Sequence, residues 1–235
     1  MAPPDLSPLK QPIAIRPEHI ATSPTRLRVK QRDNALHSGD FSISKEETSF
    51  SGGANNAGAS TEAPQPSKLF TVDGKLLSVS QRRIFYDASS LPLFEVCRKA
   101  LGTTWYVQVP GAGRDGADLR LAELAPRFSA FKDNLDLYVR NAAADGEDAF
   151  LEVRGQDIWK LRTNVYVDGK PVMTVKRTDK LAVYVLGKHL EWVVDVAEGM
   201  DLSLASAIVV VMAATMYDSN ITMPVSRSAG KSGGG

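Results

Sequence analysis

Between residues 68 and 196, short apolar runs rich in Val, Leu, Phe and Tyr are separated by turn-forming residues. Most runs alternate apolar with polar positions, the period of a β-strand that has one buried face. They are LFTV, KLLSVS, RRIFY, LFEVCRK, TWYVQV, LDLYVR, FLEVRG, DIWKL, TNVYV, PVMTVKR, LAVYVL and LEWVVDV. Because no long helical period separates them, βαβ units are not expected. The pattern predicts about a dozen antiparallel strands.

One segment departs from this pattern: DLSLASAIVVVMAATMYDS, at residues 201–219. The 16 residues between Asp201 and Asp218 carry no charge. As a helix they would span about 24 Å, short of the roughly 30 Å hydrocarbon core of a bilayer, and no Lys or Arg flanks them. Their length and their alanines favour helix over a strand at residues 208–211. We expect a buried helix, capped by Asp201 or Ser203, rather than a membrane span.

A helix that is apolar all round must be enclosed, by lipid or by protein. Many antiparallel strands can enclose one by closing into a barrel, which also removes exposed edges. The predicted fold class is therefore mainly β: a roughly twelve-stranded antiparallel closed β-barrel around a central hydrophobic C-terminal α-helix. A short internal repeat suggests a duplicated hairpin. FYDASSLPLFEVCR (85–98) and YVDGKPVMTVKR (166–177) share an aromatic residue, an aspartate, a proline and Val-x-Arg.

These segments resemble the LURP-one-related family. The resemblance is carried by LFTVDGK, RRIFYDASSLPLFEVCRK and FLEVRGQDIWKLRTNVYVDGKPVMTVKR, and most specifically by VYVLGKHLEWVVDVAEGMDLSLASAIVVVMAATMYD. Its members adopt the tubby C-terminal-like fold, a barrel around a central C-terminal helix. The resemblance implies that Gly199 and Asp201 form the corner before the helix, that residues 202–217 thread the barrel, and that TRLRVKQ and SGDFSIS form the first hairpin.

The resemblance also implies one domain where composition alone suggests a linker. Residues 45–67 are rich in Gly, Ala, Ser, Pro and Asn, as flexible linkers are. In the family pattern they are an insertion in a hairpin loop, which costs little entropy. We expect a single barrel domain over residues 25–220 with a disordered insertion at about 45–67. Residues 1–24 and 221–235 are expected to be a disordered arm and a disordered tail.

Net charge and cysteine content narrow the function classes. A net charge of +1 gives no whole-protein attraction to nucleic acid, which is not expected as a partner. Cys97 is the only cysteine, so no intramolecular disulfide and no cysteine-based zinc site can form. The N-terminus has no secretory apolar region. The expectation is a cytoplasmic protein, peripheral at membranes, with no transmembrane span.

Little in the sequence points to catalysis. Gly111, Gly113 and Gly116 satisfy GxGxxG, but no βαβ context surrounds them and only a short helical run, ADLRLAELA, follows. We therefore interpret residues 111–127, and likewise 141–148, as loop expansions.

The histidines and the cysteine also have ordinary explanations. His19, His37 and His189 do not have metal-ligand spacing, so no metal and no cofactor are expected. Cys97 is expected to be a small packing residue. No nucleophile, base and acid can be assembled into a set, and the protein is expected not to be an enzyme.

The remaining candidates are basic residues at the ends of predicted strands: Arg82, Arg83, Arg98, Lys99, Lys176 and Arg177. By alternation, Arg98 shares a face with the apolar residues of its strand, and Arg177 does so in the equivalent strand of the internal repeat. Such residues must bend over the rim, pair with an acid or meet an anionic ligand. Rim ion pairs and solvated strand ends are the simpler interpretation. A lipid-headgroup pocket is the functional one.

Tubby proteins, which share the fold that the resemblance implies, bind phosphatidylinositol bisphosphate through basic residues on the barrel. We predict a non-enzymatic intracellular binding or scaffold protein that binds phosphoinositide or another anionic phospholipid at membrane surfaces, and protein partners through its loops. The alternative is a membrane-inserted, scramblase-like lipid-handling protein, although the cysteine-rich palmitoylation stretch of scramblases is absent. A transcription-related nucleic-acid-binding role is a third hypothesis, disfavoured by the near-neutral charge.

Overall fold

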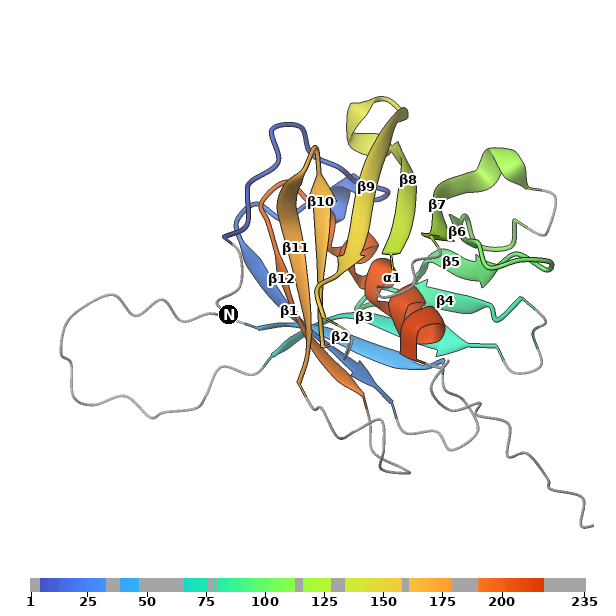
Figure 1. Ribbon diagram of the computed structural model, residues 1–235. Helices are drawn as coiled ribbons and strands as arrows, with labels where there is room; N and C mark the ends of the chain where they lie inside the picture. Colours follow the sequence, from blue (N-terminus) through green and yellow to red (C-terminus); the bar gives the residue numbers. More distant parts are fainter. Residues whose placement is uncertain are drawn as a thin grey trace, which may run out of the picture.

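The strands of the protein form one closed antiparallel barrel (Figure 1). The computed structural model describes residues 5–32, 39–46, 66–75, 78, 80–112, 116–127, 134–157, 161–178 and 190–217. Each strand pairs with its neighbours along the chain, and the first pairs with the last to close the ring. The predicted fold class, a mainly β, twelve-stranded antiparallel closed barrel with one C-terminal α-helix, is confirmed.

The bounds of the elements within these residues are as follows. The strands are β1 (Thr25–Gln31), β2 (Phe41–Glu46), β3 (Ser67–Gly74), β4 (Arg83–Tyr86), β5 (Pro92–Arg98), β6 (Trp105–Gln108), β7 (Arg120–Arg127), β8 (Asn134–Asn141), β9 (Glu147–Gly155), β10 (Arg162–Val167), β11 (Lys170–Arg177) and β12 (Glu191–Val196). The helical elements are α1 (Leu202–Met212), the short 3-10 turns η1 (Pro17–His19), η2 (Ala117–Leu119) and η3 (Ala142–Ala144), and the π-helical turn η4 (Ala213–Tyr217).

The barrel has two distinct ends because odd-numbered strands run one way and even-numbered strands the other. We call the end where α1 begins the entry end. It contains the starts of the odd strands, the β8–β9 and β10–β11 turns, and the N-terminal arm, and it lies at the top of Figure 1. The opposite exit end contains the ends of the odd strands and the starts of the even ones.

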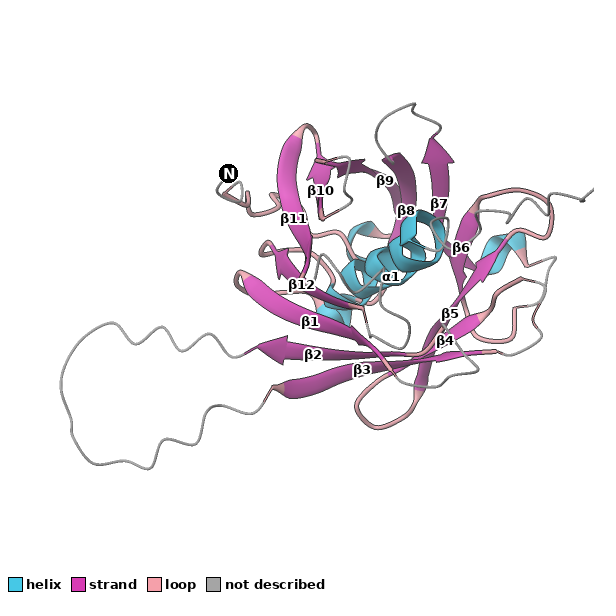
Figure 2. Cartoon of the chain, turned by 60° about the horizontal axis from the view of Figure 1, so that its bottom comes forward, coloured by secondary structure: helices cyan, strands magenta, loops and turns pink. Residues whose placement is uncertain are grey.

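The hydrophobic core fills the space between the strands and α1. Figure 2 shows α1 inside the ring of strands, and every residue of Leu202–Met212 is buried. Alternation turns one face of each strand toward the helix, as in β1, where Leu27 and Val29 are buried while Arg28 and Lys30 are exposed. A helix with strands on all sides has no solvent face, which explains why its sequence is apolar all round.

No helix in the described part of the chain is both long enough and apolar enough to cross a membrane.

The helix begins at a buried corner. Gly199 has a φ of +90°, and a Cβ there would lie 2.9 Å from the Cβ of Leu9, so only glycine fits. Asp201 is the N-cap: its Oδ1 accepts hydrogen bonds from Ser203 N at 2.7 Å and Leu204 N at 3.3 Å. Burial raises the pKa of the Asp201 carboxyl, against the opposing effect of the donors that surround it. The corner implied by the family resemblance is therefore present.

The N-terminal arm is ordered where it crosses the entry end, so the expectation of disorder over residues 1–24 is wrong for 5–24. Ile13 and Ile15 are buried. The Ile13 N–H donates to the Gly199 carbonyl at 3.0 Å, and Asp201 Oδ2 accepts from Ile15 N at 3.0 Å. The arm covers backbone groups that the start of α1 would otherwise leave buried without partners. Its prolines interrupt any regular period, which is why its sequence resembled a disordered arm.

The insertion expected at residues 45–67 falls between two paired strands. Lys45 in β2 is paired with Ser67 in β3, so the chain between them is a hairpin connection of the barrel. Residues 47–65, and the tail expected at 221–235, lie outside the described residues.

The clearest error in the predicted elements is β7. Residues 117–125 were predicted to be a short helical run within a loop, yet β7 forms full ladders with β6 and β8. Ala122 and Leu124 point into the core, and Glu123 lies on the other face. Leu, Ala and Glu favour a helix in an isolated segment. Here, pairing of β7 with a strand on each edge and burial of one of its faces stabilise a strand instead. The expected loop at 141–148 is likewise reduced to η3 and a tight turn between β8 and β9.

Three other predicted strands were placed incorrectly or lie outside the described residues. The described residues of KLLSVS form part of a turn after β3, where Lys75 N donates to Arg82 O at 2.8 Å. The middle of DIWKL, residues 158–160, lies outside the described residues, and at its ends the Asp157 carboxylate accepts from Leu161 N at 3.0 Å and Arg162 N at 2.9 Å. LAVYVL lies outside the described residues.

The internal repeat corresponds to two hairpins with the same pairing, β4–β5 and β10–β11. Tyr86 pairs with Pro92 and Tyr166 with Pro171, in each case beside a shift of register. The two hairpins lie on opposite sides of the ring. The internal repeat therefore places Arg98 and Arg177 at equivalent strand ends.

Candidate functional site at the basic end of the barrel

The six basic residues predicted from the sequence all lie at the exit end, in two groups. Arg82, Arg83, Arg98 and Lys99 lie at the start of β4 and the end of β5. Lys176 and Arg177 end β11, which is diametrically opposite β5 in the ring. The structure thus brings the six residues to one end of the barrel but does not gather them into one pocket.

Within the β4–β5 group the side chains have different roles. Arg83 is only 5% exposed and turns inward, with its guanidinium carbon 5.1 Å from the centre of the Trp105 ring. Arg82 Nη1 lies 3.6 Å from Glu95 Oε2, and Arg98 Nε donates to the Gly102 carbonyl at 3.0 Å. The Lys99 side chain is exposed.

The partner of Arg82 is a buried carboxylate on the outer face of β5. Glu95 is 1% exposed and accepts from Gln108 Nε2 at 2.6 Å and from Gly111 N at 3.5 Å. The start of the glycine-rich segment therefore covers this acid, as a loop. Burial, with the neighbouring Glu95 charge, raises the pKa of the Cys97 thiol, which fits a packing residue and not a reactive one.

Lys176, in the second group, makes an ion pair across the barrel wall. Its Nζ lies 3.1 Å from Asp195 Oδ2, while Asp195 Oδ1 accepts from Arg26 Nε at 2.6 Å. Burial acts to raise the pKa of Asp195, but the hydrogen bonds from Arg26 and Lys176 outweigh it and the net pKa is lowered. Arg177, at the register position opposite Trp192, is half-buried. The rim-pair interpretation thus describes Lys176 and Arg82.

Replacing Asp195 with Asn is expected to destabilise the protein by about 1 kcal/mol at neutral pH, because two partly exposed cations lose their shared partner. A lowered carboxyl pKa contributes stability above its ordinary value, near 3.8, and that contribution is lost as the pH falls through the folded-state pKa. The difference between variant and parent in urea unfolding should therefore shrink below about pH 4. Glu152→Gln, which removes an exposed pair with Arg154, is the control. A difference independent of pH would contradict the assignment.

The predicted residues belong to a larger group of basic side chains at the exit end. Among the described residues, this end carries twelve basic side chains: Lys30, Arg32, Lys75, Arg82, Arg83, Arg98, Lys99, Arg127, Arg154, Arg162, Lys176 and Arg177. The same end carries six acidic ones: Asp40, Asp73, Asp136, Glu152, Asp157 and Glu191. Since the whole chain has a net charge of only +1, positive charge is concentrated at this end.

The entry end has the opposite excess. Its acidic side chains in the described residues are Asp5, Glu18, Glu46, Asp87, Asp118, Asp145, Glu147, Asp148, Asp168, Asp195 and Glu198, and its basic ones are Lys10, Arg16, Arg26, Lys45, Lys68, Arg120, Arg140 and Lys170. The charge therefore changes sign along the barrel axis.

Three lysines of the exit end are available to a ligand. Lys30, Lys75 and Lys99 are exposed, and within the described residues their side chains make no ion pair. By contrast Arg127 pairs with Asp136 at 2.6 Å. Only Lys99 of the three was predicted from the sequence, because Lys30 and Lys75 join it only when the antiparallel ring brings alternate strand ends together.

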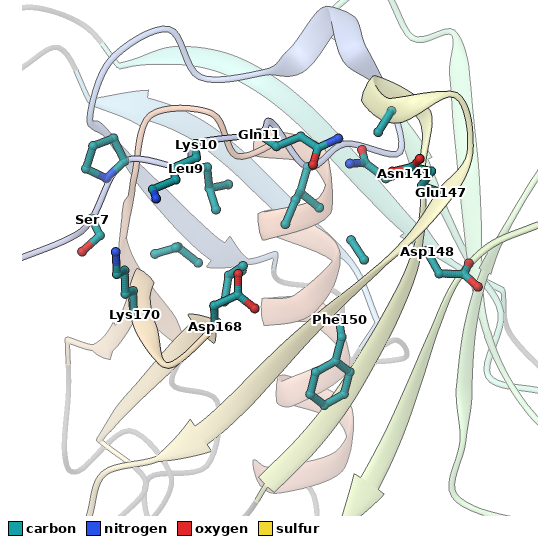
Figure 3. Close-up of a pocket in the computed structure, with 16 residues that line it drawn as sticks. Ser7, Leu9, Lys10, Gln11, Asn141, Glu147, Asp148, Phe150, Asp168 and Lys170 are labelled. Atoms are coloured by element: carbon teal, nitrogen blue, oxygen red, sulfur yellow. The ribbon is translucent and has the colours of Figure 1, made fainter.

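A second feature, not predicted from the sequence, is a cavity of about 990 Å³ at the entry end. The N-terminal arm and the β8–β9 and β10–β11 turns line it (Figure 3). Lys10 and Lys170 lie near Asp168 on one side, and Glu147 and Asp148 lie on the other. Because both signs of charge meet here, the cavity does not favour an anion. It depends on an arm that was expected to be disordered, so no sequence signal could locate it.

Metal ligation has no support in the described residues, where no group of three or more His, Cys, Asp or Glu could hold an ion. His19 instead packs edge-on against Phe70, with ring centres 5.0 Å apart. His37 and His189 lie outside the described part of the chain, as does Gly113 of the glycine-rich segment.

Comparison with solved structures defines the class of protein first. The closed barrel is similar to the X-ray structure of a protein from Arabidopsis thaliana, with a TM-score of 0.55, 16% identity, and coverage of 88% of this chain and 98% of the other. At that identity the likeness concerns the fold alone. The model of the LURP-one-related family matches residues 25–213. The chain belongs to the LURP-one-related family, as its sequence motifs indicated. No curated protein matches it.

Proposed function

We propose that the protein is a non-catalytic binding module whose exit end docks on anionic phospholipid headgroups at an intracellular membrane surface. The observation that carries this proposal is the concentration of basic side chains at one end of a nearly neutral chain. Each Lys or Arg close to an anionic leaflet contributes about 1 kcal/mol, and ammonium groups form charge-assisted hydrogen bonds with phosphate.

The environments of the reactive side chains in the barrel wall favour binding over catalysis. Glu95 is buried against Gln108, Asp195 is shared between Arg26 and Lys176, and the Cys97 thiol is buried. These groups stabilise the barrel wall and are not presented to a substrate. Exposed lysines at or just after strand ends are suited instead to hold a polyanionic surface without chemistry.

The test compares two triple variants that remove the same charge from opposite ends. Lys30, Lys75 and Lys99 are exposed at the exit end, and Lys10, Lys68 and Lys170 are exposed at the entry end. Changing the first three to Ala should weaken co-sedimentation with phosphatidylcholine vesicles containing phosphatidylserine or phosphatidylinositol bisphosphate by roughly a hundredfold. The second triple variant should bind like the parent protein.

Both variants should melt like the parent, because substitutions of exposed residues change stability little. Binding should also fall steeply with added salt. If the parent does not sediment with any anionic vesicle, or if the two triple variants weaken binding equally, docking through the exit end is wrong.

A further inference from the structure

The turn between β5 and β6 presents an unusually exposed apolar side chain at the basic end. Leu101 is 87% exposed, more than any other exposed large apolar residue of the described chain. Lone exposed leucines are common on protein surfaces and need no explanation by themselves. The position of Leu101 is what distinguishes it, since Arg98 and Lys99 lie only two or three residues before it at the exit end.

The geometry of the turn holds Leu101 away from the barrel. Lys99 N donates to the Thr104 carbonyl at 2.8 Å, which closes the turn, and Arg98 Nε donates to the Gly102 carbonyl at 3.0 Å in an exposed hydrogen bond, which adds a second link across its base. Gly102 has a φ of +126°, and a Cβ added there would meet nothing within 4 Å. The tip of the turn therefore projects into solvent on a braced base.

We propose that the β5–β6 turn is a membrane-inserting tip, in which Leu101 enters the hydrocarbon boundary while Lys99 and Arg98 stay at the headgroup phosphates. This inference rests on the proposed function and commits it to a bilayer rather than to a soluble polyanion. Basic residues can extend to the headgroups as a neighbouring apolar side chain enters the acyl region.

A bilayer fits this tip better than a protein partner does. A stable protein interface needs about 800 Å² from each partner, which one leucine on a narrow turn does not provide. Membrane attachment, by contrast, requires only modest apolar burial combined with electrostatic attraction to anionic lipid.

The β4–β5 turn provides a matched control at the opposite end. Leu91 is 61% exposed there, but its neighbour is acidic: the Asp87 carboxylate accepts from Leu91 N at 2.8 Å. An acidic turn at the entry end should be repelled by an anionic leaflet. The two leucines therefore share side-chain type and turn context while differing in surrounding charge.

The experiment measures vesicle partitioning and depth for both positions. Leu101→Ser should weaken binding to phosphatidylcholine–phosphatidylserine vesicles about tenfold, since most of a leucine's transfer free energy is lost. Leu91→Ser should have no effect. Leu101→Trp should be quenched by lipids brominated on their acyl chains, whereas Leu91→Trp should not. A soluble inositol polyphosphate should bind the parent and Leu101→Ser equally.

The outcomes separate this inference from the proposed function. If the Lys30, Lys75 and Lys99 variant loses binding while Leu101→Ser binds like the parent and Trp at 101 is not quenched, electrostatic docking stands and insertion is overturned. If the parent fails to bind vesicles at all, both are overturned. Equal loss for Leu101→Ser and Leu91→Ser would also overturn insertion, because it would show no preference for the basic end.

Discussion

Replacing Val210 with Asp is expected to abolish folding of the entire barrel. Val210 is 0% exposed in the last turn of α1, where the inner faces of the strands surround it. A carboxylate there has no partner, and an unpaired buried charge costs several kcal/mol or more. Since a domain of this size is stable by only about 5–15 kcal/mol, the substitution removes most or all of that margin.

The measurement is far-UV circular dichroism with urea unfolding, in which the variant should lose the cooperative transition. Val109→Asp makes the same chemical change at a loop residue that is 37% exposed, and it should unfold like the parent. A Val210→Asp protein that remains folded with a native midpoint would show that α1 is not the structural centre of the barrel. The membrane-anchor alternative predicts that result, since loss of an anchor would leave the domain intact.

Replacing Asp201 with Ala should destabilise the protein by about 3 kcal/mol or more. The carboxylate is 0% exposed and caps α1 through Ser203 and Leu204. Its second oxygen accepts from Ile15 N at 3.0 Å and Arg16 N at 2.9 Å. Alanine would leave these buried and part-buried donors without their acceptor, so the loss of the cap and the cost of unsatisfied groups act together.

Asp201→Asn separates the two roles of this residue. Its amide oxygen can still cap the helix, but its NH2 group would face the N–H groups of Ile15 and Arg16. We expect a smaller loss of stability and a selective release of the arm, seen as faster proteolysis and faster amide exchange over residues 5–20. Asp118→Ala, at an exposed position, is the control. If Asn and Ala behave identically in both measurements, the carboxylate does not hold the arm.

The elements that could be predicted from the sequence are those whose signal is local. Alternation in LFEVCRK and PVMTVKR identified β5 and β11 because side chains of a strand point alternately to two faces. The uninterrupted apolar run at residues 202–212 identified α1 because a helix enclosed on all sides needs no polar face. Asp201 could be proposed as the cap since acids at N-caps follow a short-range rule.

The failures lie where a distant partner decides the structure. β7 has the composition of a helix and becomes a strand through ladders to β6 and β8. The arm is ordered because Asp201 accepts from Ile15, 186 positions earlier. Closure of the ring likewise places Lys30 and Lys75 at the same end as Lys99, a grouping that no local pattern records.

The sequence by itself therefore determined the class of fold, the buried helix and the strand-end position of the basic residues. Only the tertiary structure decided which of those residues are tied to acids, which remain exposed, and that Leu101 stands beside them. The physical reason is the separation along the chain over which each kind of interaction acts. Periodicity and capping act over a few residues, whereas ion pairing, burial and surface charge depend on which strands the closed ring brings together.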